Sequence, residues 1–316
     1  MKRRATIVII GLTALAVTLP AQVPETPLSP QTAPQRPAFR TGVDIVSLNV
    51  TVMDGNTRFV SDLDEADFSV YEDGVRQDID FFSKRQQPLA LSLLLDSSAS
   101  MDDKLPMLQT AAVNFIKRLK PVDIAEVIDF DSRVEIRQEF TGNQSDLIAA
   151  VNQLGAGGST SLHNAIYIAL KELRKIRAVN EEDIRRQALV VFSDGEDTSS
   201  LVSFEEVLDL AKRSETSVYS IALRGVDTQT KGFKEAEYVM RTLAHETGGR
   251  SFFPSRIEDL NGVYQQINDE LSSQYTIGYI SKNQRRDGGL RRLVVRVNRP
   301  NHTARTRQGY YAPTGR

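Results

Sequence analysis

An apolar run that stops at a carboxylate and two hydroxyls constrains this chain more than any other feature. Residues 89–95 read LALSLLL, and Asp96-Ser97-Ser98-Ala99-Ser100 follow directly. A continuous apolar run of this length is typical of a strand buried on both faces, and helical spacing begins soon afterwards, near Lys104. Open α/β sheets form their binding crevices at such strand ends. Because carboxylate and hydroxyl oxygens are hard ligands, the sequence offers a divalent cation a site there.

Two later segments carry the same chemistry. Residues 157–165, GGSTSLHNA, form a glycine-rich loop that runs into a helical pattern. Residues 188–192, ALVVF, predict a second buried strand, which ends in residues 193–197, SDGED. Each motif alone is weak, since serine-rich and Asp-Gly turns end many strands. Together and in this order, they predict three loops that converge on one ion.

These three motifs resemble the metal-ion-dependent adhesion site of the von Willebrand factor A-type domain. In that family a D-x-S-x-S motif, a loop threonine in T-x-L-x-x-A and an aspartate in T/S-D-G occur in this order. The resemblance implies that the serines, with the threonine in the ligand-bound state, contact Mg²⁺ directly, while the aspartates act largely through water. The implied metal site consists of Asp96, Ser98, Ser100, Thr160 and Asp194.

The chemistry of Mg²⁺ explains why such a site binds partners. The ion demands octahedral oxygen coordination, so neutral hydroxyls leave it strongly electrophilic with a water still to exchange. An acidic side chain of another protein suits that position. We therefore expect Mg²⁺ as the cofactor, with Mn²⁺ or Ca²⁺ as alternatives, and a protein ligand with an exposed Asp or Glu as the partner.

Length and charge limit the other classes of function. With 316 residues, of which 40% are hydrophobic and 25% charged, the chain can form one large domain and a smaller one. The net charge of -2 provides no basic field for nucleic acid. The arginines between 285 and 292 are split by the turn Asp287-Gly288-Gly289, so we expect no nucleic-acid partner.

The first residues predict export. Lys2-Arg3-Arg4 precede an apolar stretch that ends near Ala21, which is typical of a secretory signal peptide over residues 1–21. Leu19 suits cleavage poorly, so contact with the membrane is expected only if the segment stays uncleaved. The chain has no cysteine, which favours a bacterial envelope protein, periplasmic, cell-surface or secreted. Residues 22–40 are proline-rich and predict a linker.

The remaining sequence divides into three parts. Residues 41–87 and 273–316 show the alternation of short antiparallel strands, whereas residues 88–272 alternate strand and helix patterns. Within them we expect short strands at Phe59-Val60 and at 134–136, and a helix that begins at Ile257. We expect an α/β fold, a doubly wound and mostly parallel sheet flanked by helices, Rossmann-like as in A-type domains. Since a small isolated sheet is only marginally stable, we expect the flanks to pair. The central domain would then be an insertion in a β-sandwich-like module.

The flanks carry a second resemblance. Residues 67–77, DFSVYEDGVRQ, and residues 309–313, GYYAP, together with the metal motifs, are similar to the VWFA-related domain family of acidobacterial exported proteins. This resemblance covers nearly the whole chain after residue 40. It implies little about activity, because the family is named for its domain. Ala99 stands where many relatives have glycine, which affects only the geometry of the loop.

The sequence is compatible with three functions. The favoured one is a non-enzymatic, Mg²⁺-dependent protein-binding module for adhesion or assembly. The second is a metal-dependent hydrolase or phosphoryl-transfer enzyme that uses Asp96, but His163 is the only histidine near the site and no G-x-S-x-G or H-E-x-x-H motif is present. The third is a purely structural envelope domain. Four further acidic residues either serve turns or attract a cation: Asp129, Asp131, Glu196 and Asp197.

Overall fold

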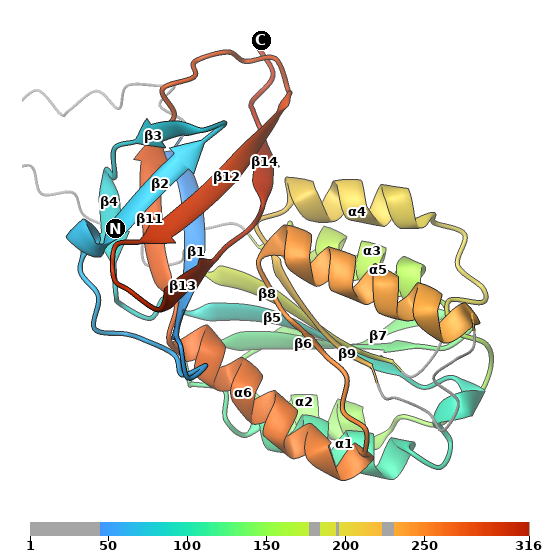
Figure 1. The fold of residues 1–316 in the computed structure, drawn as a ribbon. Coiled ribbons are helices and arrows are strands. Elements are labelled where there is room, and N and C mark those ends of the chain that lie inside the picture. Colours follow the sequence, from blue (N-terminus) through green and yellow to red (C-terminus); the bar gives the residue numbers. More distant parts are fainter. Residues whose placement is uncertain (1–44, 177–183, 194–195, 223–230, 316) are drawn as a thin grey trace, which may run out of the picture. The chain divides into compact units, whose positions relative to one another are not determined.

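The strand and helix patterns between residues 88 and 272 form a six-stranded sheet with helices on both faces (Figure 1). The strand order is β10-β9-β8-β5-β6-β7, and neighbouring strands are parallel except β6 and β7. This confirms the predicted fold class. The strands are β5 (Leu89–Asp96), β6 (Ile124–Phe130), β7 (Val134–Thr141), β8 (Arg186–Ser193), β9 (Ser217–Ala222) and β10 (Ser251–Phe252).

The computed structural model describes residues 45–176, 184–193, 196–222 and 231–315. The predicted signal peptide, the predicted linker and Asp194 lie outside these ranges. Within the described ranges, no helix is both long enough and apolar enough to span a bilayer.

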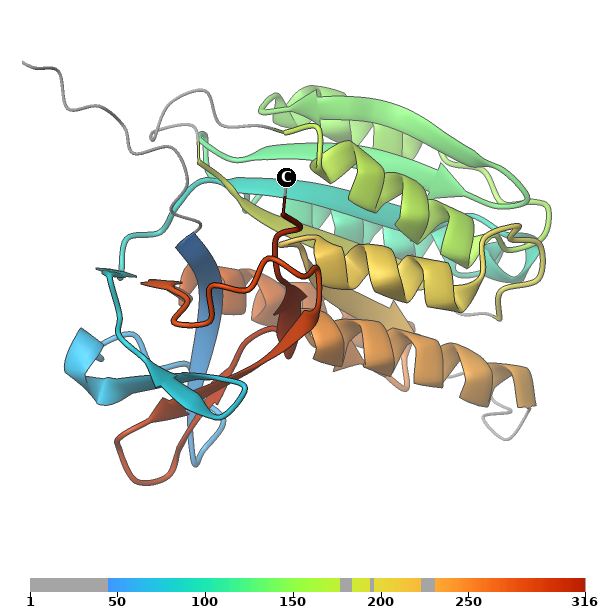
Figure 2. The same cartoon turned by 90° about the horizontal axis from the view of Figure 1, so that it is seen from above.

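Strand β5 is buried along its whole length because helices cover both of its sides. Its side chains alternate between two cores, with Leu91, Leu93 and Leu95 in one and Ala90 and Leu94 in the other. Helices α1 (Leu105–Ile116), α2 (Gln144–Asn152) and α6 (Leu260–Ser272) pack on the first face, and α3 (Leu162–Leu173), α4 (Phe204–Arg213) and α5 (Lys231–Thr247) on the second (Figures 1 and 2). Short 3₁₀ turns are η1 (Glu65–Asp67), η2 (Ala99–Met101) and η4 (Ile257–Asp259).

The two flanks of the chain pair with each other, as predicted. Strand β1 is antiparallel to β11 and to β13, and β2 is antiparallel to β12. The resulting sheets, ordered β13-β1-β11-β4 and β14-β12-β2-β3, share one apolar core. Their strands are β1 (Ile45–Asp54), β2 (Phe68–Glu72), β3 (Val75–Gln77), β4 (Phe81–Ser83), β11 (Tyr275–Ile280), β12 (Leu290–Val297), β13 (His302–Arg305) and β14 (Gly309–Tyr311).

Three predicted elements differ from the structure. Phe59-Val60 is not a strand but a single bridge to Met53, because the Asp54 carboxylate takes the backbone N–H groups of the preceding turn. The short strand predicted at 134–136 extends to Thr141, because backbone pairing with β6 outweighs its broken apolar alternation. The helix predicted from Ile257 begins as the 3₁₀ turn η4 before α6.

A buried polar network joins α6 to the flanking strands. Glu270 is fully buried, its Oε1 accepts a hydrogen bond from the Tyr219 hydroxyl at 2.8 Å, and it forms an ion pair with Arg305. Gln274 Nε2 donates to the oxygens of Tyr219 and Thr51, at 3.2 and 3.3 Å. Tyr219 lies in β9, Thr51 in β1 and Arg305 in β13, so these five residues, called the junction below, connect the inserted domain to both flanks.

A glycine at the end of α5 brings the two parts of the chain into backbone contact. Gly248 has φ +76°, and a Cβ there would lie 2.5 Å from Arg307 N and from Thr306 C. An L-residue at this position would meet both a conformational penalty and a clash with backbone. The close approach therefore requires glycine.

Candidate functional site

The site is built on the carboxyl end of β5. Asp96 is the last residue of the strand and is fully buried. Its Oδ1 accepts a hydrogen bond from Ser98 N at 2.8 Å, and its Oδ2 accepts one from Ser193 Oγ, at the end of β8, at 2.5 Å. The first bond closes the tight turn that aspartate favours, and the second fixes the carboxylate against the neighbouring strand.

The two serines of the motif come together directly after this turn. Ser98 is buried, Ser100 is exposed, and their Oγ atoms lie 3.2 Å apart. The 3₁₀ turn η2 brings the chain back on itself, so residues two apart present their hydroxyls side by side. The structure thus gathers a buried carboxylate and two hydroxyls at one strand end.

The glycine-rich loop lies against this turn. Ala99 N donates to Gly158 O at 3.1 Å, and Gly157 N donates to Ser97 O at 2.7 Å. Gly158 has φ +71°, and a Cβ there would lie 2.9 Å from Ser132 Oγ. Glycine therefore lets the loop pass close to the end of β6. Ser161 secures the same approach, because its N and Oγ both donate to Asp131 O, at 2.8 and 2.7 Å.

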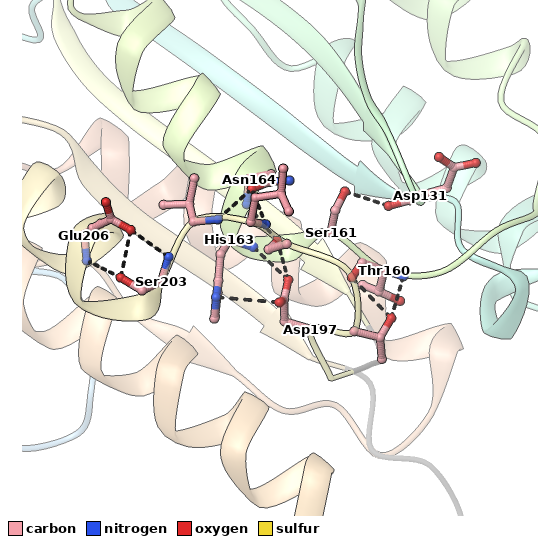
Figure 3. Close-up of polar contacts among 12 residues, drawn as sticks. Asp131, Thr160, Ser161, His163, Asn164, Asp197, Ser203 and Glu206 are labelled. Atoms are coloured by element: carbon pink, nitrogen blue, oxygen red, sulfur yellow. Dashed lines mark hydrogen bonds and ion pairs between the residues drawn. The ribbon is translucent and has the colours of Figure 1, made fainter.

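The loop after β8 holds Thr160 and the start of α3 (Figure 3). Thr160 N donates to Thr198 Oγ1 at 3.0 Å, and Thr198 N donates to Thr160 O at 2.9 Å. Asp197 Oδ1 accepts bonds from His163 N at 3.1 Å and from Ser200 Oγ at 2.6 Å. The first turn of α3 is therefore capped by a segment more than thirty residues away.

Four of the five predicted metal-site residues are thus placed, and Asp194 falls outside the described residues. Asp96, Ser98 and Ser100 belong to one turn, and the Thr160 loop is hydrogen-bonded to that turn through Gly157 and Gly158. No cluster of three or more histidine, aspartate and glutamate side chains able to hold a metal occurs in the described ranges. The candidate set is instead one carboxylate with hydroxyls, which fits a hard, oxygen-binding cation.

The charge of Asp96 is poorly compensated within the described part of the chain. Burial raises the pKa of this carboxyl, and the hydrogen bonds from Ser193 and Ser98 and the more distant charge of Lys104 oppose that rise. The donors of its hydrogen bonds, Ser98 N and Ser193 Oγ, are neutral. A buried carboxylate held by neutral donors gains most from a nearby cation.

Three of the four other acidic residues, Asp129, Asp131 and Asp197, and the His163 ring have structural partners. Asp129 accepts hydrogen bonds from Arg137 at 2.8 and 3.0 Å, and Asp131 accepts one from Arg133 N at 2.7 Å within its own turn. The His163 ring lies 3.7 Å from Asp197 Oδ2 and 6.1 Å, between centroids, from Phe204. These contacts support packing and turn formation for the residues concerned.

Sequence reasoning did not assign a role to Ser193 or Ser200, and it did not identify Asp197 as a cap of α3. Ser193 precedes the motif aspartate, and its position at the end of a buried strand could have indicated a partner for Asp96. The capping residues had no local signal, because the helix that they cap begins more than thirty residues earlier.

Comparison with known families decides the identity of the central domain. The family model of the von Willebrand factor type A domain matches residues 91–267, more than half of the 316 residues. The chain belongs to the von Willebrand factor A-type family. The matched range spans all five candidate metal-site residues of the A-type domain. No curated protein matches the chain in sequence.

Solved structures with low sequence identity have a similar fold. The von Willebrand factor type A protein from Catenulispora acidiphila is 9% identical, with 87% of this chain and 76% of that chain covered, at a TM-score of 0.50. The SpRpn10 VWA domain is 14% identical, with 57% and 95% covered, at 0.43. The PilB minor pilin from Streptococcus sanguinis is 12% identical, with 60% and 62% covered, at 0.46. These likenesses concern the fold alone.

Proposed function

We propose that this chain is an exported bacterial envelope protein whose A-type domain binds Mg²⁺ and, through the ion, an acidic residue of a partner protein in adhesion or assembly. The observation that carries the proposal is the pair of hydroxyls on Ser98 and Ser100, 3.2 Å apart and directly after the buried Asp96. Mg²⁺ would supply an electrophilic centre with an exchangeable position for a carboxylate. The residues that would hold it are Asp96, Ser98, Ser100, Thr160 and Asp194.

The chain's own residues would prepare that site in three ways. Ser193 orients the Asp96 carboxylate, Gly158 lets the Thr160 loop approach, and Thr198 holds the backbone of Thr160. Residues with locked positions lose little entropy on binding, which supports a preformed cation site. The enzyme alternative is weaker, because the contacts of the His163 ring, with Asp197 and Phe204, serve packing, and among the described residues it has no contact that would activate a nucleophile.

Calorimetric titration with MgCl₂ tests the metal site. We expect Asp96→Ala to weaken Mg²⁺ binding by at least about tenfold, since the hydroxyls alone cannot balance the charge of the ion. Asp102→Asn is the matched control, because it removes an exposed carboxylate close in sequence and should bind as the wild type does. Unchanged affinity in Asp96→Ala would contradict the metal site.

Peptide binding separates a protein-capturing site from a purely structural metal. A short peptide with one glutamate should bind in Mg²⁺ and lose affinity when EDTA is added or glutamate is replaced by glutamine. If Mg²⁺ binds but neither change affects peptide affinity, the ion only ties the loops together. Export is tested separately, by fractionating the bacterial host and determining the N-terminus of the recovered chain.

A further inference from the structure

A cavity lies next to the candidate metal site, between the starts of α3 and α5. Its volume is about 420 Å³, and its polar and aromatic lining consists of His163, Glu196, Asp197, Lys234, Glu235 and Tyr238. His163 is three residues after Thr160, and Glu196 is two residues after Asp194. An extended chain covers at most about 3.5 Å per residue, so the cavity begins within about 10 Å of the metal-site loops. We call it the side pocket.

An exposed aromatic ring forms one wall of the side pocket. Tyr238 is 64% exposed, and its ring meets the ring of Phe204 edge-on at 6.1 Å. Phe204 in turn lies 6.1 Å from the His163 ring. The row of three rings holds the Tyr238 side chain while leaving much of its surface open. An exposed ring of this kind offers its face to a cation or to a planar group.

Negative charge exceeds positive charge among the charged residues of the lining, whose apolar part consists of Leu162, Ala236 and Val239. Glu196, Asp197 and Glu235 contribute three carboxylates, and Lys234 contributes one ammonium group. Asp197 Oδ1 is occupied by the bonds that cap α3, whereas its Oδ2 faces the His163 ring at 3.7 Å. An apolar occupant would remove these carboxylates from water and provide no donor in return. A cationic occupant would provide donors and a counter-charge.

We propose that the side pocket binds an arginine side chain of the partner protein, close to the acidic residue that reaches the metal. This inference rests on the proposed function and names the partner chemistry further. The planar guanidinium group can stack on Tyr238 and donate to Glu196 and Asp197 at once. Lysine, a point charge without a plane to stack, fits less well. The pocket thus makes the domain selective for an acidic residue with an arginine nearby.

The probes are two acetylated, amidated pentapeptides, Gly-Glu-Gly-Arg-Gly and its twin with citrulline in place of arginine, each also made with the two functional residues exchanged. Citrulline keeps the shape of arginine and removes its charge. In Mg²⁺, the arginine peptide should bind the full-length protein about tenfold more tightly than its citrulline twin in one of the two sequence orders of glutamate and arginine. The matched variants Glu196→Gln and Tyr238→Leu should each reduce that ratio to about twofold or less. Lys234→Met should increase it.

Equal affinities of the arginine and citrulline peptides for the wild type would contradict arginine binding in the side pocket. An affinity ratio that stays unchanged in Glu196→Gln and Tyr238→Leu would contradict it as well. Both substituted side chains are exposed, and thermal unfolding of each variant verifies its fold. Asp96→Ala separates this failure from that of the proposed function. If glutamate and Mg²⁺ dependence hold but arginine adds nothing, only the side pocket is wrong. If arginine preference holds without any Mg²⁺ dependence, the metal-centred function is wrong and the pocket stands.

Discussion

Two carboxylates buried in the same domain, Asp96 at the end of β5 and Glu270 at the junction, are held in opposite ways. Glu270 has the guanidinium group of Arg305 as a partner and the Tyr219 hydroxyl as a second donor. Asp96 receives its hydrogen bonds from a backbone N–H and a serine hydroxyl. The protein thus supplies its own cation at the junction. At the strand end, the proposed Mg²⁺ would take the place of that cation.

This comparison separates a structural charge from a functional one. A buried charge is tolerated when a counter-charge and hydrogen bonds surround it, and it is unfavourable otherwise. Both residues are buried, so burial alone does not distinguish them. The hydrogen-bond donors distinguish them, because Glu270 has a charged donor and Asp96 has neutral ones. Variants of these buried groups test that distinction.

Removing the cation at the junction should have the largest effect. Arg305→Met leaves Glu270 buried without its counter-charge, and we expect the free energy of unfolding to fall by about 3–5 kcal/mol in urea denaturation. Arg256→Met is the matched control, because its ion pair with Asp259 has side chains 73% and 43% exposed. It should change stability by less than about 1 kcal/mol. Equal losses in the two variants would remove the special status of the junction.

At a third buried carboxyl, Glu126 in β6, the cost of burial outweighs the attraction of the Lys175 charge. Burial raises the pKa of Glu126 to about 8, from an ordinary value of 4.5. The folded protein therefore keeps a proton that the unfolded chain releases above pH 4.5, so Glu126 lowers stability progressively as pH rises from 4.5 to 8. Glu126→Gln should remove this dependence and gain about 2–4 kcal/mol relative to the wild type between pH 5 and pH 8.

Urea unfolding at several pH values measures this effect. Asp146→Asn, which removes an exposed carboxylate, is the control and should follow the pH dependence of the wild type. A difference between Glu126→Gln and the wild type that stays constant from pH 5 to pH 8 would show that Glu126 ionises normally in the folded state.

Neutralising the two compared carboxylates, without metal, should give effects of different sign or size. Glu270→Gln weakens charge-assisted bonds and should lower the free energy of unfolding by about 1.5–3 kcal/mol. Asp96→Asn keeps an acceptor for Ser98 N, loses the acceptor for Ser193 Oγ and removes a buried charge held by neutral donors. The loss and the gain oppose each other, so in EDTA the variant should change stability by less than about 1 kcal/mol, or raise it. Urea denaturation of both variants in EDTA provides the comparison. A larger loss of unfolding free energy in Asp96→Asn than in Glu270→Gln would contradict the difference between the two carboxylates.

The two regions should also act independently in the absence of metal. Tyr219 of the junction aligns through Val190 with Leu93, three residues before Asp96 and two strands away. This places the regions about 10 Å apart along the strands and about 10 Å across them. The stability changes of Asp96→Asn and Arg305→Met should therefore add to within about 0.5 kcal/mol in the double variant. A larger deviation, measured in a double-mutant cycle, would reveal coupling between site and junction.

The fold could be predicted from the sequence where the patterns are local. The continuous apolar run of β5 indicates a strand covered on both faces, and the alternation in the flanks indicates half-buried strands that need a partner sheet. The strand predicted at Phe59-Val60 was wrong, because the Asp54 carboxylate accepts hydrogen bonds from the backbone N–H groups of the turn before it. Such competition depends on side-chain geometry that a pattern of polarity does not contain.

The proximity of the three loops could be predicted from the sequence, whereas the contacts that hold them together could not. Asp96, Ser98 and Ser100 lie within five residues, so their motif is visible in the sequence. The cap of α3 by Asp197 and the pairing of Glu270 with Arg305 join residues 34 and 35 positions apart, and only the folded chain brings them together. In the sequence, Arg305 is one charged residue in a short strand of a small sheet. Its role as the counter-charge of Glu270 follows from the burial of that carboxylate.

The central claim is that the charge of Asp96 is completed by a bound cation, and its most direct test is the effect of Mg²⁺ on stability. The free energy of unfolding of the wild type and of Asp96→Asn is measured by urea denaturation, in EDTA and at Mg²⁺ one hundred times the wild-type Kd. Mg²⁺ should stabilise the wild type by about 2.7 kcal/mol and Asp96→Asn, if its affinity is at least tenfold weaker, by no more than about 1.4 kcal/mol. Equal stabilisation of both proteins, or none of the wild type, would contradict the central claim.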